Sequence, residues 1–256
     1  MEILPRFELK FWATETELHG VLDDLHGLID RDTHTPEGSR TYQITSLYFD
    51  TPKFDFFVDK VEGIKHRVKV RLRRYDSNSD GFIEVKARSG RGIRKYRVPL
   101  DGEAMRRMAG GDATPLIEHR DGKHAFAARM ILREISSHSL VPAVITVYHR
   151  EAFMFREDPT LRLTIDRNLY CAGDDLVNRF FDHREGLIRM VEWDNRAILE
   201  VKTTGPIPET MARSVRRAGL KRTSISKYCI SVAQTRHEEA VEHCKQAVLK
   251  EMYENE

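Results

Sequence analysis

The segment from Arg67 to Arg88 constrains the fold most, because it alternates between cations and aliphatic residues. A period of two places the cations on one face of a β-strand and the aliphatic residues on the other. Turn residues at 76–81 separate two alternating runs, and a second turn at 89–92 leads to a third. Three neighbouring antiparallel strands would therefore carry cations side by side. Since like charges placed opposite each other destabilise a sheet, this pattern predicts an anionic partner for the basic face.

The competing interpretation is that the basic face is simply the solvated side of an antiparallel sheet. The other predicted strands argue against it, because their pooled polar faces hold eleven cations against four acids in a chain of formal net charge +2. A solvated face in a nearly neutral protein should mix its signs. The cations are Lys10, Lys69, Arg71, Arg73, Lys86, Arg88, Lys95, Arg97, Arg150, Arg162 and Lys202, and the acids are Glu8, Glu84, Asp166 and Glu200.

The order of strands and helices predicts an α+β fold built on an antiparallel sheet. Closing the strands into a barrel would remove the exposed edges and turn the basic face inward, as a tunnel that binds a polyanion. Capping-box spacing at 14–17 and Asp101 predict two helix starts, and a long helix is expected from Ser226 to the C-terminus. Residues 171–186 are expected to be irregular. No linker divides the chain, so residues 1–256 are predicted to form a single domain.

Several function classes are disfavoured by what the sequence lacks. The cysteines Cys171, Cys229 and Cys244 form no Cys-x-x-Cys pair, which excludes a zinc ribbon and favours a reducing compartment. No segment resembles a signal peptide or a membrane span, so we expect a cytoplasmic protein. Aromatic residues are sparse on the basic face, with Tyr148 the main candidate, which argues against nucleic acid as the ligand. The glycine-rich segment 89–92 is not followed by Gly-Lys-Ser/Thr and is therefore not a P-loop.

Eight short motifs occur in the order that one known family shows, and together they are specific although each is weak alone. They are Arg6–Lys10, Ser46–Thr51, Lys69–Arg73, Phe82–Lys86, Tyr148–Arg150, Arg162–Asp166, Ile198–Lys202 and Ser226–Tyr228. Over nearly its whole length the sequence resembles the VTC (vacuolar transporter chaperone) polyphosphate polymerase domain, a branch of the triphosphate tunnel metalloenzymes.

This resemblance implies a closed eight-stranded antiparallel β-tunnel with flanking α-helices. It also implies an enzyme that uses Mn²⁺ or Mg²⁺ to transfer the γ-phosphoryl group of ATP to a growing polyphosphate chain. The implied catalytic phosphate ligands are Lys10, Arg71, Arg73, Lys86, Lys95, Arg150 and Arg162. Further implied phosphate contacts are Arg97, Tyr148, Lys202, Ser226 and Lys227, and the implied metal carboxylates are Glu200 and Glu8. Of Arg94, Lys95 and Arg97 in the third basic strand, alternation favours Lys95 or Arg97, which share a face.

Two departures from the family pattern bear on function. Tunnel hydrolases typically begin with Glu-x-Glu-x-Lys, whereas Arg6 stands at the first position here. One metal carboxylate is then missing, which favours the polymerase over a two-metal hydrolase. Secondly, the inositol-phosphate-sensing domain and the membrane helices of the eukaryotic polymerases have no counterpart in this sequence, so a membrane partner would be a separate chain. The alternatives are a triphosphatase or polyphosphatase with the same tunnel site, and a polyphosphate-binding module without turnover.

Overall fold

The structure is a computed structural model that describes residues 7–90, 92–119, 121–182, 186–190 and 196–253. Ten strands of this part of the chain form one antiparallel sheet. Two short strands, β2 (Ile29–Arg31) and β9 (Ile188–Arg189), pair with β7 and β8. The main path runs through β1 (Phe7–Thr14), β10 (Arg196–Thr203), β8 (Arg162–Ala172), β7 (Val141–Phe155), β3 (Tyr42–Asp50), β4 (His66–Tyr75), β5 (Gly81–Ser89) and β6 (Gly92–Leu100).

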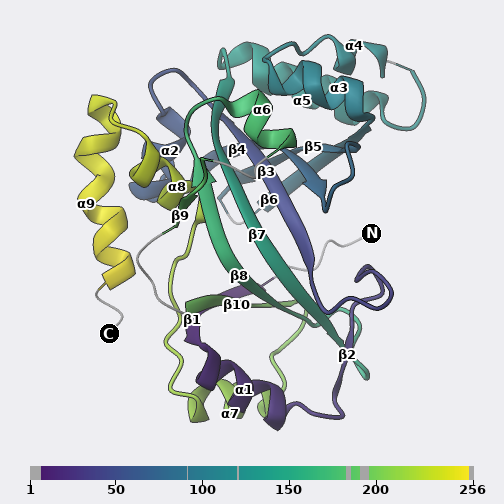
Figure 1. The fold of residues 1–256 in the computed structure, drawn as a ribbon, viewed down its shortest axis with the longest axis vertical. Coiled ribbons are helices and arrows are strands. Elements are labelled where there is room, and N and C mark those ends of the chain that lie inside the picture. The colour runs from purple at the N-terminus through teal and green to yellow at the C-terminus, as the bar shows by residue number, and fades with distance from the viewer. Residues whose placement is uncertain (1–6, 91, 120, 183–185, 191–195, 254–256) are drawn as a thin grey trace.

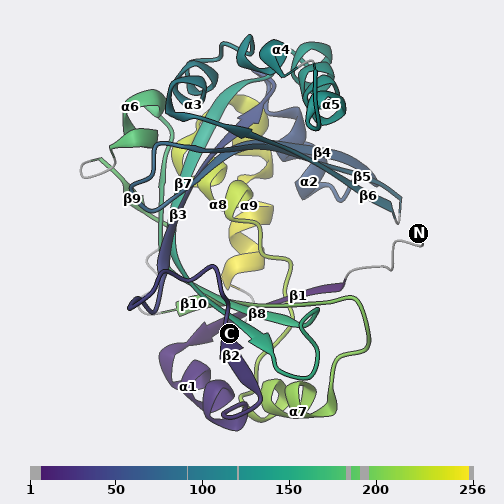
Figure 2. The same ribbon diagram turned by 90° about the vertical axis from the view of Figure 1, so that its right-hand side faces the viewer.

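The sheet is strongly curved, and Figure 2 shows β4, β5 and β6 above its hollow side and β1, β8 and β10 below it. We call the hollow side the concave face. The predicted closure into a tunnel is wrong, because β1 and β6 are the two end strands of the described sheet and do not pair with each other. The free edge of β1 is met instead by residues 222 and 223, where Arg222 forms a β-bridge with Phe11 and Thr223 N donates to the Lys10 carbonyl at 2.9 Å. A side-chain contact spans the gap, with Lys86 Nζ 3.7 Å from Glu8 Oε2.

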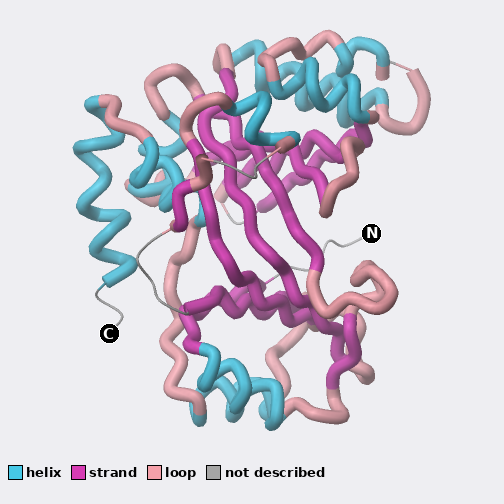
Figure 3. Tube along the Cα trace, viewed as in Figure 1, coloured by secondary structure: helices cyan, strands magenta, loops and turns pink. Residues whose placement is uncertain are grey.

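We call β4, β5 and β6 the upper arm of the sheet and β1, β8 and β10 the lower arm. Helices cover the outer face of both arms, as predicted (Figures 1 and 3). Against the upper arm lie α3 (Gly102–Ala109), α4 (Pro115–Glu118) and α5 (Ala125–Ser137), while α6 (Leu176–Phe181) packs against β7 and β3. The strand residues Val70, Ile83 and Val98 are buried there with Met105 and Ile131 of the helices. The lower arm is covered by α1 (Glu15–Asp24) and α7 (Glu209–Arg217). This division follows from the strand period, since aliphatic side chains point outward to the helices and polar ones inward.

The remaining helices, α2 (Asp55–Val61), α8 (Lys227–Thr235) and α9 (Glu239–Tyr253), lie together on one side of the sheet. Helix α8 packs against the concave face itself: Tyr228 and Ile230 belong to the same buried cluster as Ile44, Tyr148 and Ile198 of the strands. The concave face is therefore divided into an apolar end covered by α8 and a charged remainder.

The local predictions had mixed outcomes. Thr14 and Glu17 form the expected capping box, and the Asp101 carboxylate accepts a hydrogen bond from Ala104 N at 2.9 Å. The prediction of a single C-terminal helix was wrong. The backbone of Arg236 is extended between α8 and α9, and its guanidinium donates to the Ala143 carbonyl. Residues 171–186 are not uniformly irregular, since they contain the end of β8 and helix α6. The single domain over 1–256 stays a prediction, and no described helix is long and apolar enough to cross a membrane.

Candidate functional site

The strand register gathers the predicted site residues on the concave face. In the upper arm, cross-strand rows are formed by Lys69, Lys86 and Lys95 and by Arg71, Glu84 and Arg97. In the lower arm, the rows are Arg162, Lys202 and Glu8, and Thr164, Glu200 and Lys10. Arg94 lies opposite Ala87 and so on the outer face, which settles which residues of β6 belong to the concave face. The sequence alternation predicted these faces correctly.

In the upper arm, one buried acid is surrounded by cations. Glu84 lies within 4 Å of the side-chain nitrogens of Arg71, Arg73, Lys95 and Arg97. Burial by itself raises the pKa of the Glu84 carboxyl, but these four cations outweigh it and hold the pKa well below the usual range. The sequence placed Glu84 on the basic face but not among the predicted site residues, because only the register shows that cations flank it on both sides.

In the lower arm, Asp166 is a buried acid opposite Arg150, and it too was not among the predicted site residues. Its side chain is fully buried and accepts two hydrogen bonds from Arg150, at 2.6 Å from Nε and 2.7 Å from Nη2. Lys227 Nζ, at the start of α8, lies 2.5 Å from Asp166 Oδ2. Burial raises the pKa of Asp166, but Arg150 and Lys227 outweigh it and lower the pKa to about 2. Asp166 therefore holds both predicted phosphate contacts in place.

The two predicted metal carboxylates lie on neighbouring strands with Lys10 between them. Lys10 Nζ is 3.1 Å from Glu8 and 3.8 Å from Glu200, and it also donates to the Ile225 carbonyl at 3.0 Å. Lys202 Nζ lies 2.8 Å from Glu200. Burial raises the pKa of Glu200, but the cations of Lys202 and Lys10 outweigh it and hold the pKa well below the usual range. These cations therefore favour the ionised form of Glu200.

No cluster of three or more acidic, histidine or cysteine ligands occurs in the described part of the chain. Such a cluster is not required for Mg²⁺ or Mn²⁺ in a phosphate site, because these ions bind through one or two carboxylates together with substrate oxygens. Glu8 and Glu200 fit that limited requirement. A cation between them would have to displace Lys10 or Lys202 from the carboxylates.

Two buried tyrosines line the border between the charged surface and α8. The Tyr148 ring lies 4.6 Å from Lys227 Nζ and 5.4 Å from Arg150 Cζ, measured to its centroid. The Tyr48 ring lies 4.6 Å from Lys69 Nζ, and its hydroxyl accepts a hydrogen bond from Arg71 at 3.4 Å. Burial raises the pKa of Tyr48, but the neighbouring cations outweigh it and lower the pKa to about 6. Tyr48 was not predicted as a site residue.

The outer parts of the site are more open. Lys86 and Lys95 are 49% and 51% exposed at their side chains, and Arg162 pairs with the buried Asp32. Ser226 differs from its neighbour Lys227, because its hydroxyl caps α8 and accepts from Cys229 N at 3.3 Å. Arg6 lies outside the described residues, so its position relative to Glu8 is not described.

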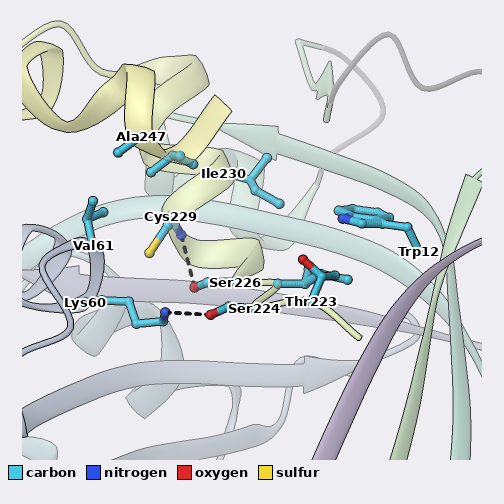
Figure 4. Close-up of a pocket in the computed structure, with 11 residues that line it drawn as sticks. Trp12, Lys60, Val61, Thr223, Ser224, Ser226, Cys229, Ile230 and Ala247 are labelled. Atoms are coloured by element: carbon cyan, nitrogen blue, oxygen red, sulfur yellow. Dashed lines mark hydrogen bonds between the residues drawn. The ribbon is translucent and has the colours of Figure 1, made fainter. Parts of the chain in front are cut away.

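Figure 4 shows that Ser226 lines a separate pocket between α2, α8, α9 and the segment 223–226. Lys60 Nζ donates to Ser224 Oγ at 3.2 Å there. Trp12, Val61 and Ile230 supply much of its apolar wall. The pocket does not contain the cation cluster, and of its lining residues Ser226 was predicted as a phosphate contact.

A curved antiparallel sheet with a charged concave face and helices outside defines the triphosphate-tunnel type of fold. A solved structure of a putative adenylyl cyclase from Hippeastrum, described as having a dominant triphosphatase activity, has a similar fold: the TM-score is 0.53 at 14% identity, covering 90% of this chain and 96% of that one. Within this type, the chain belongs to the VTC domain family, whose family model matches residues 5–236.

Similar curated proteins are subunits 4 of vacuolar transporter chaperone complexes. The protein from Schizosaccharomyces pombe is 28% identical over 156 residues, which cover 53% of this chain and 21% of the relative. The protein from Trypanosoma cruzi is 23% identical over 244 residues, covering 78% of this chain and 30% of the relative. This chain thus matches less than a third of the length of either relative.

Proposed function

We propose that this protein is a metal-dependent polyphosphate polymerase that works on the concave face. The observation that carries the proposal is that cations from both arms of the sheet converge there in a protein of nearly neutral net charge. Membership in the VTC family and the tunnel-type fold support an enzyme that handles phosphate chains.

In the proposed reaction, a terminal oxygen of the polyphosphate chain attacks the γ-phosphorus of ATP. The bond from this phosphorus to the β,γ-bridging oxygen breaks, ADP leaves with the electron pair, and the chain is longer by one phosphate. Such a transfer needs little covalent chemistry from the protein, so catalysis depends on positioning and charge neutralisation. Arg71, Arg73 and Arg97 above and Arg150 and Arg162 below offer planar donors that match phosphate oxygens.

The other predicted residues have supporting roles in this proposal. Lys10, Lys202 and Lys227 add positive charge at the lower arm, and the half-exposed Lys86 and Lys95 would guide the chain at the opening. Tyr148 and Ser226 remain proposed phosphate contacts. Mn²⁺ or Mg²⁺ would be held by Glu200 and Glu8 and would neutralise charge on the phosphates when bound.

The proposed partners are ATP and inorganic polyphosphate. A cytoplasmic location is part of the proposal, and it is supported by Cys171, Cys229 and Cys244, which are buried thiols.

Incubation with ATP and Mn²⁺, followed by phosphorus NMR, tests the proposal. Signals of internal phosphates of a long chain support the polymerase, orthophosphate alone indicates a hydrolase, and unchanged ATP indicates a binding module. Arg71→Met should abolish the product, because Arg71 lies on the concave face. The matched control is Arg156→Met, since Arg156 forms an exposed ion pair with Asp30 and should leave product formation unchanged.

A further inference from the structure

Glu84 is the most heavily paired acid of the upper arm, and its side chain is only 3% exposed. Its Oε2 accepts a hydrogen bond from Arg71 Nε at 2.9 Å and lies 2.8 Å from Arg71 Nη2. Its Oε1 contacts Arg97 at 2.6 Å from Nε and 2.5 Å from Nη2, and Lys95 Nζ at 3.0 Å. Arg73 Nη1 lies farther away, at 3.9 Å from Oε2. One carboxylate therefore connects the cations of both flanking strands.

The geometry of these contacts fixes the guanidinium planes. Arg71 and Arg97 each present the Nε–Nη2 edge to Glu84, and Nη1 of Arg71 already donates to the Tyr48 hydroxyl, so the donors left for another acceptor are the second hydrogens of the Arg71 amino groups and the Nη1 side of Arg97. The second group near Arg71 is the Tyr48 hydroxyl at 3.4 Å, and Arg97 stacks over the Phe82 ring at 4.6 Å. Each arginine is thus held on two sides, with donors remaining for an incoming anion.

The charge of Glu84 has a second consequence. It offsets one of the four surrounding positive charges. An incoming phosphate must also share these cations with Glu84, because the carboxylate is a fixed part of the protein. Glu84 therefore lowers the affinity of the cluster for anions while it keeps the donors aligned. A site that adds phosphates one at a time to a chain benefits from both effects, because binding that is too tight slows movement of the product.

We propose that Glu84 is a positioning residue of the phosphate site, which orients Arg71 and Arg97 and limits how tightly the concave face retains a phosphate chain. This inference rests on the proposed function. It adds a residue that touches no reacting atom and acts through the arginines. A purely structural acid would stabilise the fold without restraining anion affinity, so the two roles differ in measurable ways.

The test compares Glu84→Gln, which removes the charge, with Glu84→Asp, which keeps the charge and moves it by one methylene. Binding of tripolyphosphate without metal is measured by calorimetry, and kcat is measured with ATP and Mn²⁺. Glu84→Gln should tighten tripolyphosphate binding by about tenfold, because a repulsive charge near the anion disappears, and should lower kcat. Glu84→Asp should bind as the wild type does, with a lower kcat.

The matched control is Glu151→Gln. Glu151 is another buried acid with two arginine partners, Arg31 at 3.1 Å and Arg167 at 2.9 Å, but it pairs with Ile165 on the outer face of the sheet. Its substitution should lower thermal stability and leave tripolyphosphate affinity unchanged.

Weaker or unchanged tripolyphosphate binding by Glu84→Gln would overturn the inference. If Glu84→Gln does not fold, Glu84→Asp decides: a lower kcat at unchanged affinity supports the inference, and any other result overturns it. A wild-type protein that neither binds tripolyphosphate nor converts ATP would instead overturn the proposed function, so the two failures are distinguishable.

Discussion

Replacing Asp166 with asparagine should destabilise the protein strongly, although the two side chains have nearly the same shape. The Asp166 side chain is fully buried and is the shared acceptor of Arg150 and Lys227, both of which are 12% exposed at their side chains. The amide removes the negative charge and leaves two cations close together in a site with little water. Breaking a buried ion pair by removing one partner costs about 3–5 kcal/mol.

The pKa of Asp166 gives a second way to calculate how much stability the substitution removes. Its decrease from the usual 3.8 to about 2 corresponds to roughly 2 kcal/mol of stability. The range of roughly 2–5 kcal/mol, at about 2–4 °C per kcal/mol for a domain of this size, predicts a decrease in Tm on the order of 10 °C.

The assay is thermal unfolding followed by circular dichroism, with Asp30→Asn as the matched control. Asp30 forms the same kind of two-bond pair with Arg156, at 2.8 Å and 3.0 Å, but its side chain is 58% exposed. Exposed pairs contribute about 0–1 kcal/mol, so this control should shift Tm only slightly. Similar shifts for the two variants would refute the reasoning from burial.

The difference in stability between wild type and Asp166→Asn should depend on pH, and this dependence independently checks the role of the Asp166 charge. The pKa of Asp166 is lower in the folded protein than in the unfolded chain, so its contribution is fully present above pH 3.8 and is lost as the pH falls towards about 2. The stability gap between wild type and Asp166→Asn should therefore narrow over that interval. A stability difference that stays constant between pH 3.8 and about 2 would contradict the claim that the ionised Asp166 carboxylate provides the stabilisation.

Three further predictions concern single residues. Glu200→Gln should lower metal-dependent turnover by orders of magnitude while tripolyphosphate still binds, and near-normal turnover in this variant would rule out Glu200 as the metal carboxylate. Spectrophotometric titration should detect a tyrosinate that forms with a pKa of about 6 and is absent in Tyr48→Phe, whereas identical titrations would disprove the effect of the cations. Gly81→Ala should cost about 1–3 kcal/mol, because its Cβ would lie 2.2 Å from the Arg73 carbonyl. Gly20→Ala in helix α1, with no atom within 4 Å of its Cβ, should be neutral or stabilising by up to about 1 kcal/mol, and equal losses for the two would contradict the packing argument.

The composition of the concave face could be predicted from the sequence because it depends on a local property. Side chains in a strand alternate with a period of two, so Arg71, Lys86 and Glu200 were placed on one face without knowledge of the strand order. The chemistry of the site depends on non-local pairing. The central positions of Glu84 and Asp166 appear only when β5 lies between β4 and β6 and when β8 lies beside β7.

Tertiary contacts also explain the predictions that were wrong. The residues that follow α8 favour a continuous helix, but the contact of Arg236 with the Ala143 carbonyl accompanies a break. Helix α2 was not predicted, because it follows Phe54 in a left-handed backbone conformation and is held by Asp50, which accepts hydrogen bonds from Phe56 N and Phe57 N. Closure of the sheet was predicted by analogy with barrels and depends on edge strands that alternation does not describe.

A crystal structure with a non-hydrolysable ATP analogue and Mn²⁺ would test the central claim most directly. The account predicts that the triphosphate lies on the concave face, between Arg71 and Arg97 above and Arg150 below, with Mn²⁺ bound to Glu200 and a phosphate oxygen. Phosphates bound only on the outside of the protein, for example along the exposed arginines Arg216 and Arg217 of α7, would contradict it.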